Sequence, residues 1–309
     1  MPVMPHPSRR AALALGVGGL TAVLTGCGVR LDDNAPQLPL IPTRGPSSAE
    51  IALLAAYGSL ATRASAATGD LRDLLTARAS GLRHALEGVG VTTADLDAAR
   101  ADSPAPARLG EEIVALRLGL SDCPVGLLPI TGSLVAASMT ESEDMMRLWS
   151  IGSEDPTEWS DPVPAKPALQ ATRAALWAAT IIVARCAPAD RDLATESVAV
   201  LRDLQTRQIT ASADDGADVA LGYTLDQPAS TPDEVRLLAR TTLERLTTSY
   251  AQVFAHLDTD RIAAFEVSTW LAQAQGLAAR WGVPIPPFPG LADPAPPAAE
   301  PTPTDSPST

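Results

Sequence analysis

The sequence predicts an all-α protein, and three observations support this fold class. Alanine and leucine, which favour helices, dominate a chain in which only 4% of the residues are aromatic. Apolar residues recur at helical spacing over several long stretches, and residues typical of helix starts and ends flank these stretches. No alternating apolar and polar pattern of useful length indicates a β-strand.

Residues 1–26 have the features of a bacterial lipoprotein signal peptide. Arg9 and Arg10 precede a short apolar run, and Leu-Thr-Gly then leads to Cys27. A basic start, an apolar core and small residues at the cleavage site are typical of secretory signals. We therefore expect cleavage before Cys27 and lipidation of this cysteine; the alternative is an ordinary signal peptide that happens to place Cys27 near the cut. The two arginines fit twin-arginine export as well as the general pathway.

A lipidated Cys27 predicts an extracytoplasmic protein that is held at the cell membrane. One acyl chain binds a membrane only marginally, but bacterial lipoproteins carry a diacylglycerol on this cysteine, with acyl chains such as palmitate. Residues 27–46 hold several prolines and no periodicity, so they predict an extended spacer between the anchor and the folded part. The apolar run at residues 174–184 is too short to span a bilayer and predicts a buried helix.

Residues 47–152 form the first predicted helical region. Ser47, followed by Glu50 three residues later, is typical of a capped helix start. Apolar periodicity then predicts helices over Ile51–Ala67, Leu71–Leu86, Ala94–Arg100, Glu111–Leu120 and Leu134–Trp149.

Residues 153–167 interrupt the helical pattern with prolines and charges, and we expect a linker there. Thr231-Pro232 followed by two acids is typical of a helix start, with a cap, a proline and negative charge at the positive end of the helix dipole. Residues 292–309 are rich in Pro, Ala, Thr, Ser and acids, which predicts a disordered tail. Between these segments, residues 168–291 carry four long helical patterns, over Ala168–Cys186, Ala189–Ala211, Pro232–Leu257 and Thr259–Trp281.

The chain is strongly acidic, with a net charge of −13, and loss of Arg9 and Arg10 with the signal peptide makes the mature protein more acidic still. Nucleic-acid binding needs clustered basic side chains that displace counterions, so we expect no nucleic-acid partner. Anionic lipid would also repel this chain unless a covalent anchor held it. The charge therefore agrees with membrane attachment through lipid.

Cys123 and Cys186 are the two cysteines that remain once Cys27 is lipidated. In an oxidising compartment they are candidates for a disulfide. Such a bond would close a loop of about 60 residues and stabilise the fold by roughly 4 kcal/mol. The alternative is two buried thiols that never meet. Neither cysteine lies in a CxxC motif or near a histidine, so we expect no metal site at either.

Several segments of the C-terminal half together form a recognisable pattern. They are residues 169–177 (LQATRAALW), the helix through Tyr250, and the stretch from Trp270 to Trp281 that is followed by Pro-Phe-Pro-Gly at residues 287–290. This pattern resembles the ferritin-like domain of unknown function of actinobacterial proteins. The resemblance implies an up-down four-helix bundle over residues 168–291, and residues 28–44 resemble the post-anchor region of lipoproteins that carry this domain.

The ferritin-like resemblance raises the question of iron. A di-iron bundle needs a Glu from each of two helices and a Glu-x-x-His from each of the other two. This chain has no Glu-x-x-His, and Thr172-Arg173 stand where relatives often place Glu-His. We therefore predict no metal site and no cofactor.

Other catalytic chemistries find little support in the sequence. His84 and His256 fall on strongly helical stretches, and there is no G-x-S-x-G, S-x-x-K or Gly-rich phosphate loop. Four acids could form a carboxylate site, but we expect them on the solvated face: Glu196, Glu234, Glu244 and Glu266. Four aromatic residues could line a pocket, but their spacing favours core positions: Trp177, Trp270, Trp281 and Phe288.

These observations predict a non-enzymatic, lipid-anchored protein that acts as a scaffold or binds an envelope protein partner. A second hypothesis is a small-molecule binder with an apolar pocket between helices. A metal-dependent oxidoreductase of ferritin-like type is the third and least favoured. An open pocket with inward polar groups would favour the second hypothesis, and a filled core would argue against it.

Overall fold

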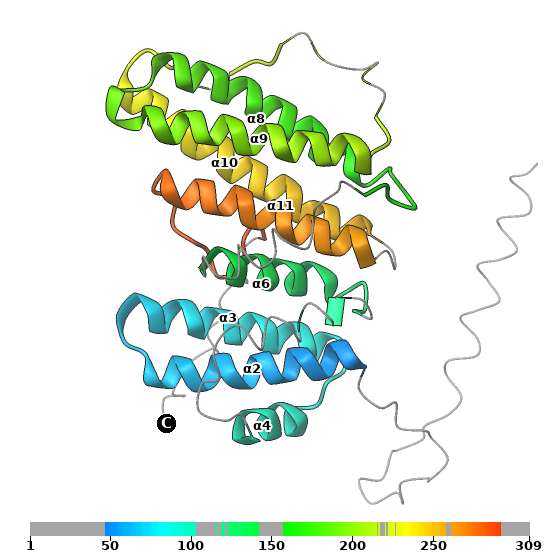
Figure 1. Cartoon of the computed structure of the whole chain (residues 1–309). Helices are drawn as coiled ribbons and strands as arrows, with labels where there is room; N and C mark the ends of the chain where they lie inside the picture. The colour runs from blue at the N-terminus through cyan, green and yellow to red at the C-terminus, as the bar shows by residue number, and fades with distance from the viewer. Residues whose placement is uncertain are drawn as a thin grey trace, which may run out of the picture. The chain divides into compact units, whose positions relative to one another are not determined.

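A computed structural model describes residues 47–102, 116, 119–120, 123–141, 157–214, 216, 220, 222–225, 227–257 and 261–291 (Figure 1). Within these residues all regular structure is helical, which confirms the predicted fold class. The described residues all belong to one compact unit that begins at Pro46. Arg9, Arg10, Cys27, the spacer and the C-terminal tail lie outside them. None of the described helices is long and apolar enough to cross a membrane.

The N-terminal helices begin close to their predicted positions. In the first, the Ser47 hydroxyl accepts a hydrogen bond from the Glu50 N–H (3.2 Å), and the Glu50 carboxylate accepts one from the Ser47 N–H (2.6 Å). This capping box satisfies two backbone donors at the helix start. The first helix packs against the next two and buries Leu53 fully. The three helices are α2 (Ser48–Ala66), α3 (Gly69–Gly88) and α4 (Thr93–Asp102).

The C-terminal half contains the four long helices that the periodicity predicts. Thr231 caps the third helix as predicted, and the structure adds that Glu234 completes a capping box with it. The four helices are α8 (Ala165–Arg185), α9 (Arg191–Ala211), α10 (Pro232–Val253) and α11 (Arg261–Arg280), with the short turns η1 (Pro188–Asp190) and η2 (Phe254–His256). α8 packs against α9 and α10, and α10 packs against α11, whereas α9 and α11 make few contacts (Figure 1).

The four helices do not alternate strictly up and down along the chain. The Arg236 guanidinium of α10 pairs with Asp190 at the start of α9 (Nε to Oδ2, 2.8 Å), so α9 and α10 begin at the same end. The Trp281 indole, just after α11, donates to Ser197 near the start of α9 (3.1 Å), so α11 runs back toward that end. The connection from Ala211 to Pro232 must therefore return along the bundle. Its length permits this crossover where a short turn would not.

Helix α6 (Leu128–Glu141) belongs to the first helical region but packs mainly on α11 of the second (Figure 1). Gly132 lets it approach the fully buried ring of Phe254, because a Cβ at this position would lie 2.3 Å from Phe254 Cζ. The helix begins earlier than the predicted Leu134, and residues 142–149 of that prediction lie outside the described residues. Of the predicted helix 111–120, only Leu116, Gly119 and Leu120 are described.

Residues 287–290, the Pro-Phe-Pro-Gly segment, connect the two helical regions. Arg78 of α3 donates to the Pro287 carbonyl (Nε to O, 3.0 Å), and Ser133 of α6 donates to the Pro289 carbonyl (2.9 Å). Gly290 adopts φ +74° beside α10, and a Cβ there would lie 2.4 Å from the Thr247 carbonyl oxygen. Only glycine satisfies both the left-handed backbone and this contact. The segment thus contacts α3, α6 and α10.

Buried side chains from both helical regions form one continuous core. Leu82 of α3 and Leu204 of α9 are both members, and so is Trp159, which is 6% exposed although it lies in the predicted linker. That the two helical regions on either side of residues 153–167 are separate folding units stays a prediction. In the structure, residues from both regions contribute to the same core.

Candidate functional site

A polar cluster lies in the interior of helices α8 to α11. Thr172 of α8, Gln208 of α9 and Tyr250 of α10 are all fully buried. Thr172 Oγ1 lies 2.6 Å from Gln208 Oε1 and 2.6 Å from Tyr250 Oη. One consistent arrangement of hydrogens has Tyr250 donate to Thr172 and Thr172 donate to Gln208. The Thr172 hydroxyl therefore links the Tyr250 hydroxyl and the Gln208 carbonyl oxygen in the buried core.

Burial controls the protonation of this cluster. It raises the pKa of Tyr250 to about 12, against a smaller lowering effect of the hydrogen bonds to Thr172 and Gln208. The phenol therefore stays protonated and neutral at physiological pH. The Gln208 Nε2 amide has no hydrogen-bond partner within the described structure. An unpaired buried donor of this kind costs about 1–3 kcal/mol.

Two tryptophans extend the cluster to α11. The Trp270 ring lies 6.1 Å from the Tyr250 ring and stacks on Trp159, with centroids 5.2 Å apart. Trp159 Nε1 in turn donates to Glu266 Oε2 (2.7 Å). Burial raises the pKa of the Glu266 carboxyl above its ordinary value, although hydrogen bonds from Trp159 and Thr157 oppose the shift. This carboxyl group therefore accepts hydrogen bonds from the Trp159 indole and from Thr157.

Arg173 follows Thr172 in the chain but has a different partner. Its Nη2 lies 2.8 Å from Asp214 Oδ1, just after α9. The Arg173 hydrogen bond is the main reason that the pKa of Asp214 lies below its ordinary value. Thr172 therefore belongs to the neutral network, and the neighbouring Arg173 belongs to an ion pair.

A di-iron centre does not fit the residues of this core. It would need several carboxylates and two histidines that point inward. In the described cluster the groups are Thr172, Gln208 and Tyr250, and Glu266 is its one carboxylate. Within the described part of the chain there is no group of three or more His, Cys, Asp or Glu side chains that could hold a metal ion. The donor set therefore argues against metal chemistry here.

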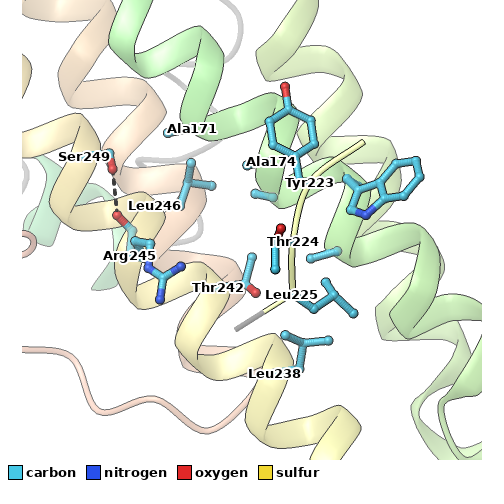
Figure 2. A pocket seen from close by; sticks show the side chains of 13 residues that line it. Ala171, Ala174, Tyr223, Thr224, Leu225, Leu238, Thr242, Arg245, Leu246 and Ser249 are labelled. Atoms are coloured by element: carbon cyan, nitrogen blue, oxygen red, sulfur yellow. Dashed lines mark hydrogen bonds between the residues drawn. The ribbon is translucent and has the colours of Figure 1, made fainter. Parts of the chain in front are cut away.

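A cavity of about 90 Å³ lies outside this cluster, between α8 and α10. Figure 2 shows the segment through Tyr223, Thr224 and Leu225 crossing over it, while Ser249 donates to the Arg245 carbonyl at one side. Its other walls are mostly alanine and leucine side chains. Pockets for small organic ligands are usually about 300–1,000 Å³. The cavity is therefore too small for a ligand of that size.

A family model described as a domain of unknown function, DUF4439, matches residues 165–293. A DUF4439 domain is therefore present in this chain. The matched region starts with the first residue of α8 and includes α11 and the Pro-Phe-Pro-Gly segment. The prediction that this part of the chain is a domain of unknown function is therefore confirmed. No curated protein and no solved structure matches the chain. The lipoprotein and actinobacterial parts of the resemblance stay predictions.

The four candidate acids occupy different environments. Glu196 pairs with Arg280, Glu234 caps α10, and Glu244 is exposed, as expected of a solvated face. The same expectation is wrong for Glu266, which is buried in the DUF4439 domain against Trp159. The structure does not bring these acids together into one carboxylate site.

The aromatic residues were expected in the core, and three of them lie there. Trp270, Trp281 and Phe288 are buried. Trp177 is 40% exposed, so the expectation is wrong for this residue. Its ring lies against Gly222, in the connection that crosses over α8 and α10.

Cys123 and Cys186 are free thiols in the structure, so the candidate disulfide is not formed in it. Cys123 Sγ lies 3.4 Å from the Thr131 hydroxyl, and Cys186 Sγ, just after α8, contacts the Val183 carbonyl of that helix. Burial raises the pKa of the Cys123 thiol above its ordinary value. The structure thus corresponds to the alternative of two thiols with separate partners.

The two histidines of the helical regions lie on the surface. His84 is exposed on α3, next to the ion pair of Arg83 with Glu87, and His256 is exposed at the end of η2. Neither belongs to the buried cluster, so the structure supplies no base for a nucleophile there.

Sequence reasoning missed the cluster, although a signal for it exists. Gln208 follows Leu201 and Leu204 and precedes Ala211 at spacings that place all four on one helix face. A polar residue on an otherwise apolar face points to a partner in the core. Trp159 had a weaker signal, since it is a large apolar residue in a polar, proline-rich stretch.

Proposed function

We propose that this protein is a lipid-anchored extracytoplasmic lipoprotein whose DUF4439 domain is a ferritin-like four-helix bundle that serves as a non-enzymatic scaffold or binding module. The observation that carries the proposal is the neutral network of Thr172, Gln208 and Tyr250 in the bundle core. A ferritin-like metal centre would be built from inward side chains of this kind of core.

The helix topology supports the ferritin-like assignment. Ferritin-like bundles contain one long crossover connection, and the connection between α9 and α10 has to return along the bundle because these helices begin at the same end. A bundle with this topology and without its metal ligands retains a rigid helical surface.

The packing favours a scaffold over an internal small-molecule site. Trp270 and Tyr250 fill the centre between the helices. The two cavities inside the described part of the bundle measure about 90 and 10 Å³, and a more open groove of about 640 Å³ lies between α9 and α11. A ligand pocket of ordinary size in the centre of the bundle would require these side chains to move apart, so an internal small-molecule site is the weaker hypothesis. A ferritin-like oxidoreductase is weaker still, because the donor set does not fit a metal.

Crosslinking in living cells tests the proposal, with the tagged full chain and its Cys27→Ala variant compared side by side. We expect wild-type protein in the membrane fraction, a reproducible envelope protein crosslinked to it, and loss of both in the variant. Equal membrane association of the two forms would contradict the lipid anchor. Copurification of a stoichiometric small molecule, without a protein partner, would contradict the scaffold role.

A further inference from the structure

Residues 157–164 form a strap that leads into α8 and inserts one large side chain into the bundle. Trp159 is 6% exposed, whereas its two neighbours in the chain, Glu158 and Ser160, are both exposed. Among the strap residues ahead of Pro164, Trp159 is the only buried one. The Trp159 side chain is therefore the main anchor of the strap on the bundle.

The Trp159 ring occupies a slot on α11, formed by Glu266 and Trp270. These two residues lie four positions apart and so share one face of the helix. The Trp270 ring is nearly parallel to the Trp159 ring, with an interplanar angle of 6° and centroids 5.2 Å apart. Glu266 Oε2 accepts a hydrogen bond from Trp159 Nε1 (2.7 Å). The slot therefore matches two properties of an indole, its flat apolar face and its N–H group.

Glu266 also binds the strap through Thr157. The backbone N–H and the hydroxyl of Thr157 both donate hydrogen bonds to the Glu266 carboxylate, which is 7% exposed. One buried carboxylate thus accepts from an indole and from the main chain two residues before it. A free indole satisfies only the first of these contacts. The arrangement is therefore suited to a polypeptide segment that carries a tryptophan.

The strap has its own local hydrogen bonds just before α8. The Val163 N–H donates to Asp161 Oδ1 (3.0 Å), and the Ala165 N–H donates to the Pro162 carbonyl (3.2 Å). The part that carries Trp159 can therefore lift away while α8 and α11 keep their helical hydrogen bonds. Segments with few buried side chains open locally at a lower free energy than the whole fold.

We propose that the slot of Glu266 and Trp270 is a recognition site for a tryptophan-bearing segment of the partner protein, and that the strap closes it as an internal version of that ligand. The inference rests on the proposed role as a binding module and names the chemistry that it recognises: a tryptophan with a backbone N–H two residues before it. A tethered ligand competes at high effective concentration. The partner segment therefore binds only in the fraction of molecules whose strap has lifted.

Hydrogen exchange of the indole N–H groups tests whether the strap lifts. Trp281 is the matched control, because it is also 6% exposed and its indole donates to a single side chain, Ser197 (3.1 Å). We expect NMR of the tryptophan-labelled protein to show Trp159 Nε1–H exchanging with deuterium at least ten times faster than Trp281 Nε1–H. Equal rates, or slower exchange at Trp159, would show that the strap does not open separately and would overturn the proposal.

Calorimetric titration tests the recognition site, in the full chain with Cys27→Ser to prevent lipidation. The probe is the acetylated and amidated peptide TEWS, which is the sequence of residues 157–160. We expect this peptide to bind Trp159→Ala at least ten times more tightly than the protein with its native strap. The peptide TEFS should bind at least tenfold more weakly than TEWS, because it leaves Glu266 without an indole N–H. No binding to Trp159→Ala, or equal binding of the two peptides, would overturn the proposal.

These measurements distinguish a failure of this proposal from a failure of the proposed function. Neither uses the lipid anchor or a cellular partner, so the absence of a crosslinked protein in cells would leave both results unchanged. The exchange measurement needs no change in the bundle, so it decides the matter even where Trp159→Ala does not fold. A crosslinked partner together with a strap that does not lift would overturn this proposal alone.

Discussion

Single residues in the bundle core determine what this domain can do. Thr172 is the central member of the network, because its hydroxyl contacts both Gln208 and Tyr250. The sequence identified Thr172 only as a departure from a metal-ligand pattern. The network itself could not be predicted from the sequence, because the three partners lie on three helices whose relative register the sequence does not specify.

Replacement of Thr172 by valine keeps the shape but removes the hydroxyl. The Tyr250 hydroxyl and the Gln208 carbonyl would then be buried without this partner, and each unpaired group costs about 1–3 kcal/mol. We expect the free energy of unfolding in urea to fall accordingly. Thr172→Ser is the control, since it keeps the hydroxyl and loses one methyl group, worth about 1 kcal/mol. Equal stability of the valine variant and the wild type would show that the network contributes nothing.

Tyr250 makes stability depend on alkaline pH. Its pKa is about 12 in the folded state and 10.0 ordinarily, so the folded protein binds this proton more tightly. This contribution is complete below pH 10 and is lost as pH rises toward 12, by about 2–3 kcal/mol in total. We expect the free energy of unfolding in urea to be lower at pH 11 than at pH 9 in the wild type, and this decrease to be smaller in Tyr250→Phe. An equal decrease in the two proteins would show that Tyr250 is not a buried phenol.

At the scale of elements, close contacts of α6 and the Pro-Phe-Pro-Gly segment join the two helical regions. In α6, Gly132→Ala would bring a Cβ within 2.3 Å of Phe254 Cζ. Because overpacking of a filled core usually costs about 1–3 kcal/mol, we expect a lower melting temperature. Gly88→Ala, at a site with no neighbour within 4 Å, should leave it unchanged or raise it. The same response from both variants would contradict the described contact.

Arg78 makes a second set of contacts that connect the two helical regions. Its guanidinium donates to the Pro287 carbonyl, and its Nη2 lies 2.6 Å from Glu141 Oε1 at the end of α6. Arg78→Met should lower the free energy of unfolding by about 3 kcal/mol, the low end for a broken buried pair, because the Glu141 side chain remains 24% exposed. Arg83→Met, which breaks an exposed pair, should change it by less than about 1 kcal/mol. Similar decreases in the free energy of unfolding for the two variants would contradict the assignment of Arg78 to a buried ion pair.

The sequence predicted most helices well because their signals are local. Periodicity and capping residues located α2, α3, α10 and the ends of α9 within a few residues. The parallel start of α9 and α10 depends on a pairing between Asp190 and Arg236, far apart in the chain. Local patterns contain no information on such pairings, so the crossover and the burial of Trp159 appeared only in the structure.

For the whole molecule, one core extends from α2 to the Pro-Phe-Pro-Gly segment. Residues outside the DUF4439 domain therefore support it directly, through α6 on α11 and Arg78 on Pro287. We expect a single cooperative unfolding transition for residues 46–291. Two transitions in calorimetry, one for each helical region, would indicate separate domains with a weak interface.

The central claim is that the core of helices α8 to α11 holds a neutral hydrogen-bonded network and not the ligands of a metal centre. The most direct test is elemental analysis of the protein purified from its native membrane without refolding, together with its melting temperature before and after chelation. We predict less than about a tenth of an equivalent of iron, manganese or zinc, and no change on chelation. A stoichiometric metal whose removal lowers the melting temperature, and which Thr172→Val displaces, would contradict the account.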